Sequence, residues 1–325
     1  MSVKVHGAKP WHLGIGQTSD STGEFWTASE LSLDHILAPL RLAIEFGRVT
    51  ITIMSQTTVI ETYRELHQSG CFVLPNPWDV GSAVYLQKTG FKALATTSAG
   101  FAFSRALPDS VTAIPVELML NHVREIAAAT SLPVNADFQN CYADLPEGVT
   151  VNVSRCIGTG VAGLSIEDAT GDSKTPLYDD KLALERVQAA RSAIDASGSG
   201  VVLTARCEAA LVQYPDALRV AIDRLVAFAA AGADCLYAPG FYEPTEISAI
   251  VKAVAPKPVN VLARPGLTVS QLADLGVRRI SVGSSLARVA WGAFMRSAQE
   301  IAQEGSFASF SAGAPHGELN ELFSS

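Results

Sequence analysis

The chain has 325 residues, of which 48% are hydrophobic and 17% are charged. This composition supplies a large apolar core and excludes an intrinsically disordered protein. Lys and Arg number 24 against 32 Asp and Glu, giving a net charge of −8 without any basic run. Nucleic acid and anionic membranes are therefore not expected as partners. The length is close to that of one (β/α)8 barrel with an extension.

The five cysteines are widely spaced, with no CxxC pair and no zinc-site spacing. A disulfide framework and a structural zinc are therefore disfavoured, and a reduced, cytoplasmic setting is expected. The first residues carry no apolar core of the kind that a secretory signal needs. No apolar run is long enough to span a membrane, so no membrane partner is expected.

Residues 1–54 do not follow the pattern of the rest of the chain. We expect this N-terminal extension to cap the barrel or to mediate assembly, with a mobile tail as the alternative. Within it, residues 31–46 have the spacing of an amphipathic helix. A second helix is expected at 57–69, where it would plug the bottom of the barrel. Residues 55–325 are predicted to form the catalytic domain.

From about residue 70 onward, short β-rich runs alternate with helical stretches at a spacing near thirty residues. The clearest helices are expected at 116–130, 179–196 and 214–232. The expected strands lie within residues 71–77, 93–98, 133–139, 163–168, 201–209, 235–241, 258–263 and 278–283. Strands that are apolar on both faces and alternate with helices indicate a parallel sheet. Eight such units favour a closed α/β fold, the (β/α)8 TIM barrel, over an open doubly wound sheet.

In such a barrel the active site lies at the carboxyl ends of the strands. Asn135 and Asp137 are two residues apart in one strand and face the same side, and Glu167 ends the neighbouring strand. Carboxylates that converge there repel one another unless a cation lies between them. Oxygen ligands without His or Cys suit Mg²⁺ or Mn²⁺. The alternative is a buried ion network in which both acids pair with Arg206.

Arg206 follows an apolar run at the end of the fifth strand, where its planar cation could hold a substrate carboxylate. A salt bridge to Glu208 or Glu167 is the alternative. Ser98, Ala99 and Gly100 end the second strand with small residues, whose backbone N–H groups could bind a carboxylate or an oxyanion. A plain tight turn explains the same three residues.

No histidine lies at a predicted strand end, and no GxSxG motif supplies a base to Ser98. His122 falls in a predicted helix and is expected on the surface. Cys141 lies just past the third strand, where a small loop residue is favoured over a nucleophile or acid. The histidines and cysteines therefore give no candidate nucleophile–base pair.

Several segments together resemble the isocitrate lyase/phosphoenolpyruvate mutase superfamily, in order along the chain. They are TTSAGFAFSRALPD, LPVNADFQNCYAD, GVAGLSIEDATGD, VVLTARCEA and GVRRISVGSSLARVAWGAF. The resemblance implies a (β/α)8 barrel and a Mg²⁺-bound 2-oxo or 2-hydroxy carboxylate, with an enolate-like unit stabilised during the reaction. It also implies a homotetramer, or a dimer, in which residues 284–304 form a helix exchanged between neighbours.

Carried over residue by residue, the resemblance gives each candidate a role. Asp137 and Glu167 match the metal-site acids, and Asp109 matches the acid after the second strand. Arg206 matches an arginine that contacts substrate. The expected catalytic residues are Arg206, Asp109 and Ser98; the expected substrate-binding residues are Ser98, Ala99, Gly100, Arg206, Asn260 and Asn135; the expected metal ligands are Asp137, Glu167 and Asp109.

The chain also departs from the superfamily pattern. Asn135 replaces the first acid of a D-A-D strand, which should weaken Mg²⁺ binding. The lyase gating segment with Cys and His is absent from residues 169–180, and Ala238-Pro239-Gly240 replaces a strand-six glutamate.

We therefore expect a Mg²⁺-dependent carbon–carbon lyase of the methylisocitrate or dimethylmalate lyase kind, acting on a small di- or tricarboxylate. One alternative is a phosphonopyruvate-type mutase or hydrolase using Arg105 and Lys174, or an oxaloacetate hydrolase or decarboxylase. Another is a barrel that binds a metabolite without catalysis.

Overall fold

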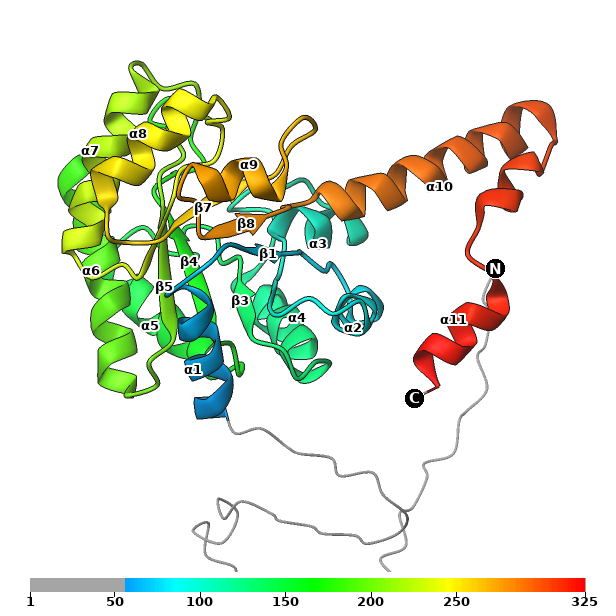
Figure 1. Ribbon diagram of the computed structural model, residues 1–325, viewed down its shortest axis with the longest axis horizontal. Coiled ribbons are helices and arrows are strands. Elements are labelled where there is room, and N and C mark those ends of the chain that lie inside the picture. The colour runs from blue at the N-terminus through cyan, green and yellow to red at the C-terminus, as the bar shows by residue number, and fades with distance from the viewer. Residues whose placement is uncertain (1–55, 325) are drawn as a thin grey trace, which may run out of the picture. The chain divides into compact units, whose positions relative to one another are not determined.

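The computed structural model describes residues 56–324, and the predictions for residues 1–54 lie outside this range. Within it, eight short parallel strands alternate with helices (Figure 1). The strands are β1 Phe72–Leu74, β2 Leu94–Ala95, β3 Val134–Ala136, β4 Gly163–Glu167, β5 Val202–Arg206, β6 Cys235–Tyr237, β7 Val259–Leu262 and β8 Arg279–Ser281. Every predicted strand is confirmed, although most are shorter than the apolar run that indicated them.

The strands pair in the order β1-β8-β7-β6-β5-β4-β3-β2, and every pairing is parallel. The first and second strands meet through single bonds rather than a ladder. The Ala95 N–H donates to the Pro75 carbonyl at 3.0 Å, and Asn76 Nδ2 donates to the Thr96 carbonyl at 2.8 Å. Asn76 Oδ1 also accepts the N–H groups of Val282 and Gly283, both at 2.9 Å. The predicted (β/α)8 barrel is confirmed.

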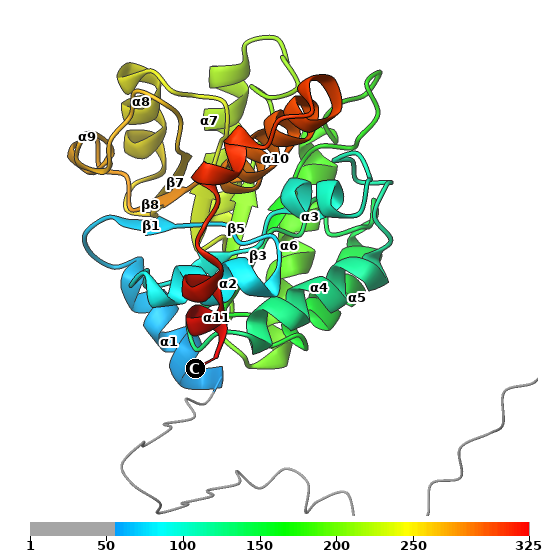
Figure 2. The same ribbon diagram turned by 90° about the vertical axis from the view of Figure 1, so that its right-hand side faces the viewer.

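The helices between residues 56 and 274 lie around the barrel, whereas the long helix after β8 leads away from it (Figures 1 and 2). The helices are α1 Gln56–Leu66, α2 Val80–Lys88, α3 Ser98–Ser104, α4 Val116–Ala128, α5 Pro146–Ile157, α6 Asp180–Ser197, α7 Ala217–Ala230, α8 Pro244–Val254, α9 Val269–Asp274, α10 Ser285–Glu304 and α11 His316–Phe323, with a 3₁₀ helix at Ala308–Ala312. Helix α1 lies at the amino ends of the strands, since Arg64 bonds to the Gly200 carbonyl and to Asp234. No helix in the described range is long and apolar enough to cross a membrane.

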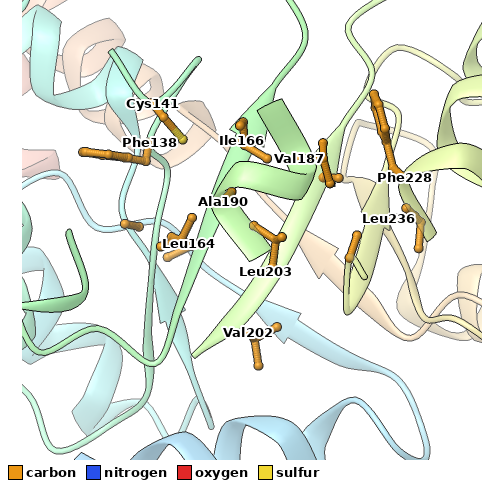
Figure 3. Packing of buried hydrophobic residues seen from close by; sticks show 14 of the residues in the cluster. Phe138, Cys141, Leu164, Ile166, Val187, Ala190, Val202, Leu203, Phe228 and Leu236 are labelled. Carbon is orange, nitrogen blue, oxygen red and sulfur yellow. The ribbon is translucent and has the colours of Figure 1, made fainter. Parts of the chain in front are cut away.

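The apolar core lies between the strands and the surrounding helices (Figure 3). Leu164 and Leu203 point outward from β4 and β5 toward Val187 of α6, and all three are buried. Because side chains alternate along a strand, Ser165 and Thr204 point into the barrel instead. Both are buried. The barrel interior is thus polar where branched apolar residues usually fill such a fold.

Helix α4 differs from the prediction in the burial of His122, and helix α10 is not packed against the barrel. His122 of α4 is 4% exposed and stacks on Phe101, with ring centroids 3.8 Å apart. The prediction of a surface histidine is wrong because α4 turns this side chain toward α3, and burial lowers its pKa to about 4. Helix α10 leads away from the barrel (Figure 1) and buries only Ala287. Its Val289 and Phe294 are 70% and 60% exposed.

Candidate active site

A cavity of about 430 Å³ occupies the carboxyl end of the barrel and reaches into its interior. The sequence-predicted residues that line it are Ser98, Ala99, Asp109, Asn135, Asp137, Glu167, Arg206 and Asn260. Gly100 does not line it, and its N–H donates to Thr97 Oγ1 at 3.2 Å. The carboxyl ends of the strands therefore bring together all but one of the predicted site residues.

Arg206 lies at the centre of the acidic side chains. Its Nη1 is 2.8 Å from Asp137 Oδ1 and 2.7 Å from Glu167 Oε1, and its Nε is 3.0 Å from Glu208 Oε1. The guanidinium also stacks over the Tyr237 ring at 4.8 Å. These carboxylates hold the pKa of Arg206 well above its usual range, against the effect of burial. The buried ion network, which was the alternative to a metal site, is present in this arrangement.

One guanidinium does not balance these acids. Asp109, Asp137, Glu167 and Glu208 all line the cavity, and only Arg206 makes ion pairs with them among the described residues. Burial raises the pKa of Glu167 well above its usual range despite Arg206, and burial also raises the pKa of Glu208. The pKa of Asp109 is raised by burial and by the nearby charge of Asp137. The surplus of negative charge favours a further cation.

Side-chain oxygens suited to a hard cation are present beside these acids. Gln139 Nε2 donates to Asp109 Oδ1 at 3.3 Å, while Gln139 Oε1 is buried without a partner. Asn135 Oδ1 is also buried and unpartnered. No three His, Cys, Asp or Glu residues between 56 and 324 are already arranged as a metal cluster. The oxygen-only donors nevertheless fit Mg²⁺, provided that it competes with Arg206 for the carboxylates.

Hydrogen bonds connect the segment after β2 to Asp137 and Asp109. The Ser98 N–H donates to Asp137 Oδ2 at 2.9 Å, and the Ser98 side chain bonds to Asp109. Thr96 Oγ1 accepts the Asp137 N–H at 2.9 Å. Two of the three backbone N–H groups expected to bind substrate are therefore engaged within the protein, and Ser98 instead positions two carboxylates.

The short segment after β4 lies beside the cavity mouth. Ala169 and Leu177 pair as an isolated antiparallel bridge, and Gly171 lies so close to Val111 that a Cβ has no room there.

Cys141, in the segment after β3, is fully buried, and burial raises its pKa to about 12, so it remains a thiol. This agrees with a small loop residue rather than a nucleophile.

Several cavity-lining residues have no role in the site predicted from the sequence, and four of these contact predicted site residues. They are Gln139, Glu208, Tyr237 and Arg279. Glu208 was considered only as a salt-bridge partner of Arg206. For Arg279 the available signal was a charged residue within a predicted buried strand. Asp168, next to Glu167, pairs instead with Arg224 at 2.8 Å and does not line the cavity.

A polar cavity with converging carboxylates at the strand ends of a parallel barrel defines an enzyme of the barrel class. Residues 63–302 match the family described as phosphoenolpyruvate phosphomutase. The chain belongs to this family, within the isocitrate lyase/phosphoenolpyruvate mutase superfamily of carbon–carbon lyases and mutases.

Individual relatives span more than one reaction. A solved candidate lyase/mutase from Burkholderia cenocepacia is 44% identical, with a TM-score of 0.80, covering 83% of this chain and 97% of the other. The 2-methylisocitrate lyase of Halalkalibacterium halodurans is 26% identical, covering 77% of this chain and 84% of its own. Oxaloacetate acetylhydrolase, solved with its product oxalate, is 26% identical with a TM-score of 0.73, covering 82% and 94%.

Proposed function

We propose that the chain is a Mg²⁺-dependent lyase that cleaves a carbon–carbon bond in a small 2-hydroxy or 2-oxo di- or tricarboxylate. The observation that carries this proposal is the group of four acids in a cavity at the strand ends, three of which form ion pairs with Arg206. The similarity to a 2-methylisocitrate lyase supports the choice of reaction.

In this proposal Asp137, Glu167 and Asp109 hold the metal, the last through water. When bound, Mg²⁺ supplies a Lewis acid that orients a carboxylate and its adjacent oxygen. Arg206, which lies among the same acids, would stabilise the negative charge that develops on the enolate fragment. Ser98 keeps Asp137 and Asp109 in place.

In this proposal the carboxylates that line the cavity accept and donate the protons of the reaction. The raised pKa of Asp109 suits it to accept the proton of the substrate hydroxyl. The carbon–carbon bond then breaks, the hydroxyl carbon becomes a carbonyl, and the bonding electrons pass to the departing enolate. Transfer of a proton from the cavity carboxylates to that enolate completes the reaction, with no net gain or loss of protons or electrons.

Oxaloacetate hydrolysis is the second candidate, because the oxalate-bound oxaloacetate acetylhydrolase shares the fold at 26% identity. A phosphonate substrate is less well supported by the geometry. Arg105 stacks over Phe101 at 5.2 Å, and neither it nor Lys174 lines the cavity.

A carboxylate panel with and without Mg²⁺ tests the proposal. The panel spans isocitrate, methylisocitrate, alkylmalates, oxaloacetate and phosphonopyruvate, with release of pyruvate, glyoxylate, oxalate and phosphate followed separately. Mg²⁺-dependent release of a 2-oxo acid from one hydroxy acid supports the lyase. Release of oxalate from oxaloacetate supports the hydrolase. A chain that neither turns over any of these nor binds Mg²⁺ would be the non-catalytic barrel.

We also propose that the protein is a homo-oligomer in which α10 packs against a second copy. This twenty-residue helix buries only Ala287 of its own chain, and it exposes Val289, Phe294 and Met295 at 70%, 60% and 53%. An apolar helix face of this size gains stability only when another surface covers it.

A further inference from the structure

Deep in the barrel lies a guanidinium without an acidic partner. Arg279, at the start of β8, is 2% exposed. Its Nε donates to Asn260 Oδ1 at 2.9 Å and its Nη2 to Thr204 Oγ1 at 3.1 Å. Its Nη1 lies 3.1 Å from the Tyr63 hydroxyl and 3.3 Å from His67 Nε2. No Asp or Glu oxygen in residues 56–324 makes an ion pair with it.

All of these partners are neutral near pH 7. Burial and the nearby Arg279 lower the pKa of His67 to about 3. Burial raises the pKa of Tyr63 to about 12. Burial also raises the pKa of the neighbouring Cys235, which therefore remains a thiol. Neutral acceptors take four of the five N–H donors of the guanidinium but do not compensate its charge, and buried charges in proteins are normally paired.

The cavity of the candidate active site reaches this guanidinium, since Arg279 and Asn260 line it together with Arg206. Arg206, Tyr237, Asn260 and Arg279 stand in one register row across β5, β6, β7 and β8. Thr204, which accepts from Arg279, precedes Arg206 by two residues, a rise of about 6.6 Å along the strand. Because Arg279 bonds to Thr204 and not to the acids at the strand ends, its guanidinium lies deeper in the barrel than that of Arg206. Arg206 forms ion pairs with three acids.

A buried oxygen without a hydrogen-bond donor also lines this cavity. Asn135 is 4% exposed and its Oδ1 has no donor. Space around that oxygen is kept by Gly163, where a Cβ would lie 2.6 Å from Asn135 Oδ1 and 2.7 Å from the Tyr63 ring. A buried acceptor beside a cavity suits a hydroxyl donor on a ligand.

We propose that Arg279 is a specificity-determining residue that binds a second carboxylate of the substrate, while Asn135 accepts a hydrogen bond from a substrate hydroxyl. This inference rests on the proposed function and narrows its substrate to acids that carry a carboxylate at each end. The first carboxylate lies at Arg206 and the metal-site acids, and the second extends into the barrel to Arg279. A monocarboxylate fills only the upper layer.

Malate and lactate test this, because both are 2-hydroxy acids and malate carries one additional carboxylate. Their binding, and that of oxalate, is measured by calorimetry in Mg²⁺ on the full chain. We expect the wild type to bind malate roughly 10- to 100-fold more tightly than lactate. Arg279→Gln should remove this preference while changing lactate and oxalate binding by less than about threefold. Arg279→Lys should restore part of it, because the charge returns without the planar fork.

The control variant is Thr204→Val, which removes one hydrogen bond to Arg279 but keeps its charge, and it should retain the malate preference. Thermal unfolding of each variant confirms that it folds. If Arg279→Gln keeps the preference, or weakens all three ligands in parallel, Arg279 has a structural role and the inference is wrong. Oxalate binding without any malate preference in the wild type overturns this inference alone. Failure of the wild type to bind any of the three overturns the proposed function with it.

Discussion

Replacing Asp137 with Asn tests the metal assignment with the smallest change in shape. Asp137 accepts from the Ser98 N–H at 2.9 Å and from Arg206 Nη1 at 2.8 Å, and an amide has one oxygen left for these two donors. Breaking a buried ion pair costs about 3–5 kcal/mol when the partner charge is left alone. Here Arg206 keeps Glu167 and Glu208, so we expect a loss of about 1–3 kcal/mol in the free energy of unfolding.

The loss of function should be much larger than the loss of stability. Mg²⁺ affinity should fall by more than the roughly 10- to 100-fold that losing an outer partner of a metal site costs. Calorimetric titration of Mg²⁺ and denaturant unfolding measure the two effects separately. Asp168→Asn is the matched control, because Asp168 is a buried acid at the end of the same sheet that pairs with Arg224 outside the cavity. It should lose stability and keep Mg²⁺ binding. Unchanged Mg²⁺ affinity in Asp137→Asn would refute the reasoning, as would equal losses in both variants.

Three further predictions follow from the same contacts. Arg206→Lys should lower turnover about 10²- to 10³-fold, because one ammonium cannot repeat the geometry of the guanidinium; steady-state kinetics at wild-type KM and kcat would contradict this. The raised pKa values of Asp109 and Glu167 mean that the stability these two carboxyl groups contribute is complete below their ordinary pKa near 4. It is lost as pH rises through the pKa of the folded state. Mg²⁺ should therefore raise the melting temperature more at pH 8 than at pH 5, and an equal shift at both values argues against binding at these acids. Phe294→Asp should dissociate the oligomer in sedimentation velocity, whereas a monomeric wild type rejects the α10 interface.

The fold could be predicted from the sequence because the barrel repeats one pattern. Each strand is flanked by a helix whose apolar side packs on it, as on the outward-facing Leu203 of β5. The periodic spacing of apolar residues that marks these strands and helices can be recognised in the sequence alone. His122 was misplaced because a single histidine in a helix does not reveal which side faces a neighbouring helix. Its stacking on Phe101 joins two helices that are separate in the pattern.

The candidate site could be predicted only in part. Strand-end positions brought Asp137, Glu167 and Arg206 together, since carboxyl ends of parallel strands share one end of the barrel. Whether a guanidinium or a metal lies between the two acids could not be decided, because either cation offsets the same repulsion. Arg279 was missed because its importance depends on the neutrality of its partners, which comes from burial rather than from residue type.

The hydrogen bonds of Asn76 mean that the mouth of the barrel can close only after both ends of the barrel sequence are present. The Asn76 amide joins the end of β1 to Thr96 and to the segment after β8, and the bond to Val282 spans 206 residues of sequence. Closing a loop of this length costs more entropy than closing a local contact, and non-local contacts slow folding. A nascent chain that still lacks β8 therefore cannot close the rim on which the candidate catalytic residues stand, so the intact cavity mouth reports that the whole barrel has been completed.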